Sequence, residues 1–348
     1  MSTRVPWQAK FGALALIWGA SFLLMKLGLE SLQPLQLATL RVLSGTATIL
    51  LVASLSGVRL PRQRRVWLHL VVSGSFLCSL PFTLFPLGEQ RVTSALAGIG
   101  NATTPLATVV FGLALMPADR LPARRLSAVL LGFLGVLVIM QPWASLGRPD
   151  LLGFGMTLVA GASYGLGWTY LKRFLGPGDV GGLSLPAAQL SMSALQMVVL
   201  VTGWWLVHRD KLAAPWSTIP GSGPALWPVV AVLVLGIVGT GFAFSLQFDV
   251  VRAVGPTMGA TVTYLIPVVA VLLGIVFLHE RLQWPQVVGA AVVLTAAAVT
   301  GLPDRGRPAA QPEGVAEEEP AAQPEGVAEE EPAGSGPGGP GERTGLSR

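Results

Sequence analysis

The sequence predicts an all-α integral membrane protein, with ten transmembrane helices arranged as two inverted five-helix repeats. Ten long apolar stretches, separated by short charged or Pro/Gly-rich breaks, fill residues 11–302. A helix that crosses the hydrocarbon core of a bilayer needs about 20 such residues. Of the whole chain, 52% is hydrophobic and 12% is charged, and the two halves of the apolar region align with each other. A soluble protein of this length would interleave charges every few positions.

The apolar stretches are interpreted as helices because the strands of a membrane barrel alternate polar and apolar residues over only about 10 positions. They divide the chain into an N-terminal segment 1–10, a first repeat 11–142, a second repeat 151–302 and a tail 303–348. The expected spans are 11–29, 35–56, 67–88, 93–116, 125–142, 151–172, 185–207, 225–248, 255–278 and 284–302.

The tail differs in composition from the rest of the chain. It carries 10 acidic residues against 4 basic ones and contains the same twelve residues twice, at Ala309–Pro320 and Ala321–Pro332. Such a segment buries too little apolar surface to offset its chain entropy, so we expect it to be disordered.

The distribution of Lys and Arg predicts which side of the membrane each loop faces. With the N-terminus inside, fourteen of these residues fall in loops on the inner side and five on the outer side. Cytoplasmic loops carry the excess of positive charge, so both termini are expected in the cytoplasm. The same rule accounts for the net charge of +5 without nucleic-acid binding. Cys78 alone provides neither a disulfide nor a thiolate metal site.

An internal repeat relates the two halves. Arg91–Pro105 (RVTSALAGIGNATTP) aligns without a gap with Ala253–Pro267 (AVGPTMGATVTYLIP), and in the first spans Trp18 aligns with Tyr164. Because each copy holds five crossings, an odd number, the two copies must lie in opposite orientations. Inverted repeats are a recurrent plan of secondary transporters, in which the substrate site lies between the copies near the membrane midplane.

The residues together resemble a known family. Ile17–Phe22 (IWGASF) opens the first span, Arg41 lies in the second, and the fourth span of each repeat is followed by a carboxylate-Arg-Leu turn, Asp119–Leu121 and Glu280–Leu282. This pattern is similar to the EamA-type branch of the drug/metabolite transporter superfamily over nearly all of residues 11–302. The resemblance implies a ten-helix inner-membrane carrier, commonly an exporter of amino acids, other small metabolites or drugs. The two turns differ by one residue in their distance from the preceding Pro, so one copy carries an insertion there.

Arg41 is the most informative polar residue within a span. It lies six residues inside the second span, where a cation at mid-depth costs at least about 2.5 kcal/mol unless it is paired or hydrated. Its planar guanidinium could bind a carboxylate or phosphate group of a solute. The alternatives are that Arg41 has a structural role or that its side chain reaches the nearer membrane interface.

Further residues are predicted to line a central polar cavity together with Arg41. Aromatic residues well inside a span favour a cavity wall over the usual interfacial belt, while amides within spans either line a cavity or join helices. Glu89, at the end of the third span, has loop anchoring as its alternative role. The predicted solute-binding residues are Trp18, Arg41, Glu89, Asn101, Tyr164, Trp168, Gln189, Gln247 and Tyr264, with Trp18 at the edge.

No motif indicates catalysis, a cofactor or a metal. The chain lacks a G-x-x-x-x-G-K-[ST] phosphate loop, an H-E-x-x-H pair and a G-x-S-x-G elbow, and its three His are far apart. We therefore expect a carrier rather than an enzyme, one that exports a small organic solute by alternating access.

Two other functions stay as alternatives. A non-transporting scaffold or receptor would work through the acidic tail, and a membrane enzyme acting on lipid-linked substrates would need paired carboxylates or a nucleophile and base. The expected partners are a small-molecule solute and the lipid bilayer of a bacterial-type inner membrane. Coupling to a proton or another ion, and assembly as a homodimer, stay open.

Overall fold

The computed structural model describes most of the apolar part of the chain, and every described element is a helix. Residues 1–302 form one compact unit. The predicted disordered tail lies outside the described residues, as do the turns at 119–121 and 280–282. The described residues are 5–92, 94–117, 122–141, 143, 150–175, 182–210, 212, 214–222, 226–266, 268–269 and 284–301.

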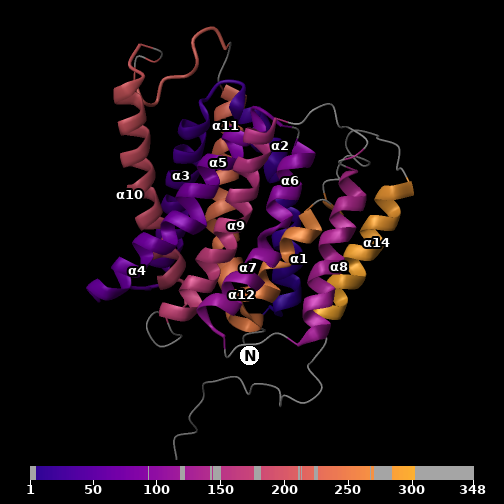
Figure 1. Cartoon of the computed structure of the whole chain (residues 1–348). Helices are drawn as coiled ribbons and strands as arrows, with labels where there is room; N and C mark the ends of the chain where they lie inside the picture. The colour runs from indigo at the N-terminus through magenta and orange to yellow at the C-terminus, as the bar shows by residue number, and fades with distance from the viewer. Residues whose placement is uncertain are drawn as a thin grey trace, which may run out of the picture. The chain divides into compact units, whose positions relative to one another are not determined.

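The helices of the first half follow the predicted spans (Figure 1). Two spans are divided: the first at Ala20, and the fourth at Thr103. Pro105 explains the second division, because a proline fits the first turn of a new helix better than a helix interior. The elements are α1 (Trp7–Gly19), α2 (Ser21–Leu29), α3 (Pro34–Leu55), α4 (Arg64–Gly74), the π-helical turn η1 (Ser75–Ser79), α5 (Leu80–Glu89), α6 (Ser94–Ala102), α7 (Thr104–Leu115) and α8 (Ala123–Met140).

The second half departs from the prediction at one loop. Residues 249–254, expected to connect two spans, are helical, and the chain changes direction at Gly255 instead. Gly255 has a φ of 83°, which glycine adopts without strain, and Pro256 follows it. The elements are α9 (Leu151–Phe174), α10 (Ser184–Val207), α11 (Leu226–Gly236), the π-helical turn η2 (Ile237–Phe242), α12 (Ala243–Ala260) and α14 (Trp284–Gly301).

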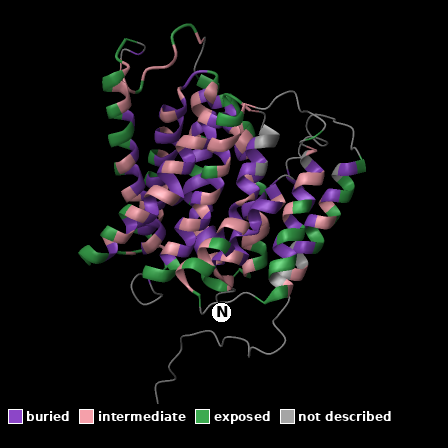
Figure 2. Ribbon diagram, viewed as in Figure 1, coloured by how far each residue is buried: buried purple, intermediate pink, exposed green. Residues whose placement is uncertain are grey.

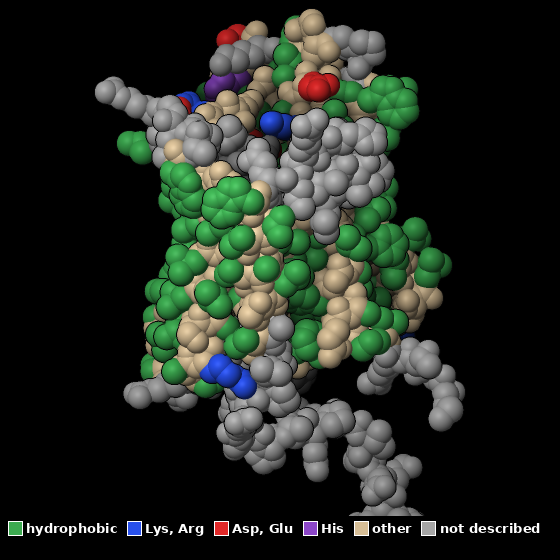
Figure 3. All heavy atoms as spheres, turned by 90° about the vertical axis from the view of Figure 1, so that its right-hand side faces the viewer, with side chains coloured by type: hydrophobic (Ala, Val, Ile, Leu, Met, Phe, Trp, Pro, Cys, Tyr) green, Lys and Arg blue, Asp and Glu red, His purple; other side chains and the backbone are tan. Residues whose placement is uncertain are grey.

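Several of the described helical stretches are long and apolar enough to cross a membrane. Six meet this criterion: Trp7–Leu29, Pro34–Leu55, Arg64–Glu89, Leu151–Phe174, Ser184–Val207 and Leu226–Ala260. Buried residues gather in the middle of the bundle (Figure 2), while large apolar side chains such as Leu51 and Leu195 are exposed. On the face shown in Figure 3, hydrophobic side chains form a broad band and charged ones lie near its two ends. The protein is a multi-pass membrane protein.

The register of the sequence repeat recurs in the element boundaries. One constant shift in residue number relates the first and last residues of α4 to those of α11. The same shift relates the first residues of the π-helical turns η1 and η2, which follow these helices. The shift is also the one that relates Arg91–Pro105 to Ala253–Pro267. π-helical turns are rare and frequently mark functional sites. Their equivalent positions in the two halves are therefore not explained by the apolar composition that the halves share.

Helix α9, the first of the second half, packs against α5, α6 and α7 of the first half. Its glycines permit this approach: a Cβ on Gly161 would overlap the backbone of Gly100, and one on Gly165 would lie 2.6 Å from the backbone nitrogen of Thr108. The Thr104 hydroxyl donates to the Gly161 carbonyl at 3.0 Å. Small residues and interhelical hydrogen bonds are what joins helices in a membrane.

Two ion pairs link the halves. Lys10 Nζ lies 2.5 Å from Asp249 Oδ2, and Arg91 Nη1 lies 3.2 Å from Asp150 Oδ2. Asp150 also caps α9, since its Oδ1 accepts from the Gly153 N–H at 2.8 Å. That hydrogen bond first, and Arg91 after it, hold the pKa of the Asp150 carboxyl below its ordinary value.

Candidate functional site

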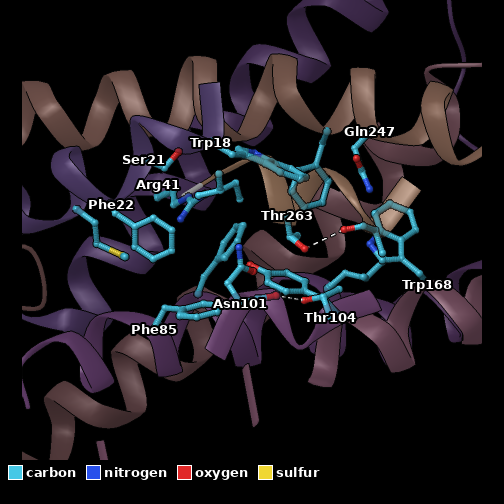
Figure 4. Close-up of a pocket in the computed structure, with 17 residues that line it drawn as sticks. Trp18, Ser21, Phe22, Arg41, Phe85, Asn101, Thr104, Trp168, Gln247 and Thr263 are labelled. Carbon is cyan, nitrogen blue, oxygen red and sulfur yellow. Dashed lines mark hydrogen bonds between the residues drawn. The ribbon is translucent and has the colours of Figure 1, made fainter. Parts of the chain in front are cut away.

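A cavity lies in the interior of the helix bundle. Its empty volume is about 730 Å³, which includes the space at its opening to solvent. Figure 4 shows the row of side chains along it, with Arg41 and Gln247 toward opposite ends and Trp18 between them. The described lining residues are Trp18, Ser21, Phe22, Met25, Arg41, Leu77, Phe82, Phe85, Asn101, Thr104, Tyr164, Trp168, Phe244, Gln247, Ala260, Thr263 and Ile266.

Arg41 is the one charged residue among the described lining residues. Only 8% of it is exposed. Its Nε donates to the Thr240 hydroxyl at 2.9 Å, and its guanidinium carbon lies 3.9 Å from the centre of the Phe82 ring, a cation–π arrangement. No described residue accepts a hydrogen bond from its two terminal nitrogens. One edge of the guanidinium is therefore fixed, and the other is left for a ligand.

The turn η2 orients two of the lining residues. Its Thr240, fully buried, holds Arg41, and its Gly239 carbonyl accepts a hydrogen bond from Trp18 Nε1 at 3.0 Å. The Thr240 hydroxyl in turn lies 3.4 Å from the Leu235 carbonyl, to which it donates. The rare backbone geometry thus lies directly behind the cavity wall.

Aromatic rings form much of that wall. Phe85 stacks on Tyr164 at a centroid distance of 6.1 Å and meets Phe22 edge-on at 6.2 Å. Trp168 packs edge-on against Phe248 at 4.9 Å. Rings held in this way present flat apolar surfaces of defined orientation to a ligand.

Polar groups from both halves interrupt the aromatic wall. The hydroxyls of Thr104 and Thr263 donate to the carbonyls of Asn101 and Ala260, at 2.8 and 2.9 Å. Gln247 is 1% exposed; its Nε2 donates to the Gly259 carbonyl at 3.4 Å, whereas its Oε1 has no hydrogen-bond partner among the described residues.

Equivalent positions of the two halves line the same cavity. Six pairs of lining residues are related by the repeat register, with one constant shift for the first helix of each half and a second constant shift for the third and fourth spans. The pairs are Trp18 with Tyr164, Phe22 with Trp168, Phe82 with Phe244, Phe85 with Gln247, Asn101 with Thr263, and Thr104 with Ile266.

A second cavity, of about 550 Å³ of empty space, follows the same helices α7, α9 and α12. Thr108 lies one helical turn beyond Thr104, and Thr169 is the neighbour of Trp168, so the two cavities are adjacent along these helices. Lys172 and the Gly255–Pro256 bend belong to the lining of the second cavity.

Comparison with known proteins decides the family. The model of the EamA-like transporter family matches the sequence twice, over residues 10–141 and 151–302. The chain belongs to the EamA-like transporter family.

Named relatives of this EamA-like transporter agree with that assignment. It is 27% identical over 75% of its length to the uncharacterized inner membrane transporter YedA of Escherichia coli K12, of which 79% is covered. It is 25% identical over 85% of its length to the uncharacterized transporter YvbV of Bacillus subtilis, of which 92% is covered. The probable amino-acid metabolite efflux pump of Escherichia coli K12 is 25% identical over 82% of the chain and 93% of its own length.

A crystal structure shares the fold of this EamA-like transporter. It matches 85% of the chain and 96% of its own length, with a TM-score of 0.66 and 20% sequence identity. Among the described residues, no group of three or more His, Cys, Asp or Glu side chains is arranged to hold a metal ion.

The cavity of this transporter brings together six of the nine residues that were predicted from the sequence: Trp18, Arg41, Asn101, Tyr164, Trp168 and Gln247. The other three lie outside its lining. Glu89 is buried at the last residue of α5, Gln189 accepts from the Ser73 hydroxyl at 2.6 Å, and the Tyr264 hydroxyl donates to the Val129 carbonyl at 2.8 Å. Polarity within a span therefore did not distinguish a cavity wall from a helix–helix contact.

The phenylalanines of the wall and the hydroxyl behind Arg41 were not predicted from the sequence. Phe82, Phe85 and Phe244 are apolar residues in apolar helices, so composition gives no signal for them. The repeat register does give one, since Phe82 and Phe244 are related by the same shift as Arg91 and Ala253. Nothing in the sequence alone singles out Thr240.

Proposed function

We propose that this EamA-like protein is a secondary carrier that exports a small organic solute from the cytoplasm by alternating access. Two inverted repeats, 11–142 and 151–302, would rock against each other around the cavity that contains Arg41. The repeats would comprise ten crossings, with both termini in the cytoplasm and the carrier in an inner membrane. The predicted residues Trp18, Arg41, Asn101, Tyr164, Trp168 and Gln247 would contact the solute.

The observation that carries this proposal is the pairing of equivalent residues around one cavity. Residues related by a repeat meet only near the axis that relates the two copies. A cavity lined by six such pairs is therefore what two related bundles around a shared site should produce. The odd number of predicted crossings per copy makes that axis one that lies in the membrane plane.

The ends of the bundle support alternating access. Each ion pair joins the start of the first helix in one half to the segment near the end of the third span in the other half. Three predicted crossings separate Lys10 from Arg91, so the two pairs would lie on opposite sides of the membrane. A carrier needs a closure at each side that opens in turn.

The outward direction of transport is supported by one relative, which is named a probable amino-acid metabolite efflux pump. We infer that outward movement is the physiological direction here too.

Counterflow in proteoliposomes tests the proposal. The purified full chain is reconstituted, loaded with one unlabelled solute at a time from a panel of amino acids, organic acids, sugars and cationic drugs, and offered the same labelled solute outside. We expect at least one member to be exchanged well above protein-free vesicles. Exchange of none, with correctly folded protein, would overturn the proposal.

A truncated chain separates the carrier from the scaffold alternative. Deleting Pro303–Arg348 removes the acidic tail and leaves both family matches intact. A carrier should retain its exchange rate, whereas a scaffold that works through the tail should lose its partner.

A further inference from the structure

We infer that the solute is an amphipathic organic monoanion: one carboxylate or similar acid group, a flat ring-bearing body, and a hydrogen-bond donor at the end away from the acid. This inference rests on the proposed carrier function and concerns the same cavity. Three separate features of the wall carry it, one for each part of the solute.

The acid group follows from the charge of the cavity. Arg41 is the one ionised side chain of the described lining, and no Asp or Glu belongs to that lining. With Nε held by Thr240 and one face covered by Phe82, the guanidinium presents its two terminal nitrogens in the parallel geometry that a carboxylate accepts. A cationic solute would meet the like charge of Arg41, which is buried in the wall.

The ring-bearing body follows from the aromatic wall. Rings of Trp18, Phe22, Phe85, Tyr164 and Trp168 line the same cavity as Arg41. Such walls stack on flat apolar groups and leave the many hydroxyls of a sugar without hydrogen-bond partners. A solute with one acid group and a sugar-like body therefore does not fit this lining.

The donor follows from Gln247, toward the end of the cavity away from Arg41 (Figure 4). Its Oε1 is buried and accepts no hydrogen bond from a described residue. A buried acceptor without a donor is costly, so a ligand that supplies an O–H or N–H here is favoured over one that does not. The equivalent position in the other half is Phe85, which makes the cavity unequal at its two ends and sets one orientation of the solute.

Four small aromatic molecules test the donor and the acid group separately, and the sugars and organic acids of the wider panel test the ring-bearing body. Full-length protein in proteoliposomes is assayed for exchange of labelled para-hydroxyphenylpropionate, with competition by phenylpropionate, which lacks the donor, by para-hydroxyphenylpropionamide, which lacks the charge, and by tyramine, which reverses it. We expect phenylpropionate to compete about tenfold more weakly than the parent, which corresponds to about 1.4 kcal/mol. The amide should compete more weakly still, and tyramine should not compete.

Two variants assign the effects to their residues. Gln247→Leu should abolish the difference in competition between para-hydroxyphenylpropionate and phenylpropionate. Arg41→Gln should abolish the preference for the carboxylate over its amide. Gln196→Leu is the matched control, because Gln196 bonds to Val71 and Ser75 near η1, outside the cavity lining, and it should retain both differences.

Two results would overturn the inference and leave the carrier proposal standing. One is competition by tyramine or the amide as strong as that by the carboxylates. The other is exchange of only cations or sugars from the wider panel. Exchange of no solute of any class would overturn both.

Discussion

Thr240 shows how a residue outside the cavity lining can control the residue that faces it. Its hydroxyl is the only described hydrogen-bond acceptor on Arg41. Replacing it with valine keeps the shape of the side chain and removes that acceptor, so the guanidinium should turn within the cavity.

We predict that Thr240→Val raises the KM for exchange roughly tenfold, in line with the approximately 1.5–3 kcal/mol of a hydrogen bond to a charged group. The maximal exchange rate should change less than the KM. Thr240→Ser restores the hydroxyl and should restore the KM, as measured by concentration-dependent counterflow. A serine variant as impaired as the valine variant would show that the packing of η2, and not the hydrogen bond, matters.

Tyr264 gives the opposite case, a polar residue that the sequence suggested for the site and that the structure places in a helix–helix contact. Tyr264→Phe removes the hydrogen bond to the Val129 carbonyl and should lower the free energy of unfolding by about 1 kcal/mol. Solute affinity should stay unchanged. Thermal unfolding in detergent and counterflow on the same preparation measure the two effects, and a change confined to affinity would contradict this placement.

At this scale the sequence predicts chemistry better than location. Arg41, Asn101 and Gln247 are polar residues within predicted spans, and the structure places all three in one cavity. Gln189 also lies within a predicted span, but it accepts a hydrogen bond from Ser73 outside the cavity lining. Which face of a helix turns inward depends on packing against its neighbours, which a single apolar sequence encodes weakly.

Among the elements, α9 shows most clearly how packing positions the site. It contributes Tyr164 and Trp168 to the cavity, and its glycines set how close it lies to α6 and α7. The apolar stretches predicted most helices to within a few residues. The π-helical turns and the helical course of residues 249–254 were not predicted, because backbone hydrogen-bond registers leave no mark on hydropathy.

We predict that Gly161→Leu separates α9 from α6, because any Cβ at this position would overlap the Gly100 backbone. Overpacking of this kind costs typically about 1–3 kcal/mol, so the melting temperature in detergent should fall and the yield of monodisperse protein should drop. Gly155→Leu in the same helix is the control, since a Cβ at Gly155 meets nothing within 4 Å. Equal losses in both variants would contradict the role of close packing at Gly161.

For the whole molecule, the ion pair between Lys10 and Asp249 is expected to hold one end of the bundle closed. Both side chains are partly exposed, and such a pair contributes about 0–1 kcal/mol. Lys10→Glu also replaces the attraction by a repulsion, so it should increase the population open at that end by about fivefold. The measure is labelling of Thr263→Cys, in a Cys78→Ser background, by an impermeant maleimide applied from either side. The double variant Lys10→Glu with Asp249→Lys should restore the original rate; if it labels as the single variant does, the pair is not a closure.

The pair at the other end should be insensitive to pH in the ordinary range. The pKa of Asp150 is lowered, chiefly by the Gly153 N–H and then by Arg91. Its stabilising effect is therefore present above the unfolded-state pKa of about 3.9 and is lost only as the pH falls through the lower folded-state value. The effect of Arg91→Gln on maleimide labelling should accordingly be constant between about pH 5 and 8. A titration within that range would point to a different partner.

The unequal partners around the cavity have one more consequence. Two separate identical subunits, assembled about an axis, would have to present each side chain twice, and a guanidinium on one subunit would bring its duplicate into the same hollow. Joined in a single polypeptide, the halves are free to diverge, so that Arg41 has no basic counterpart in the other half and Phe85 is the counterpart of Gln247. The covalent link between the two halves is what allows the two ends of the cavity to differ in their side chains.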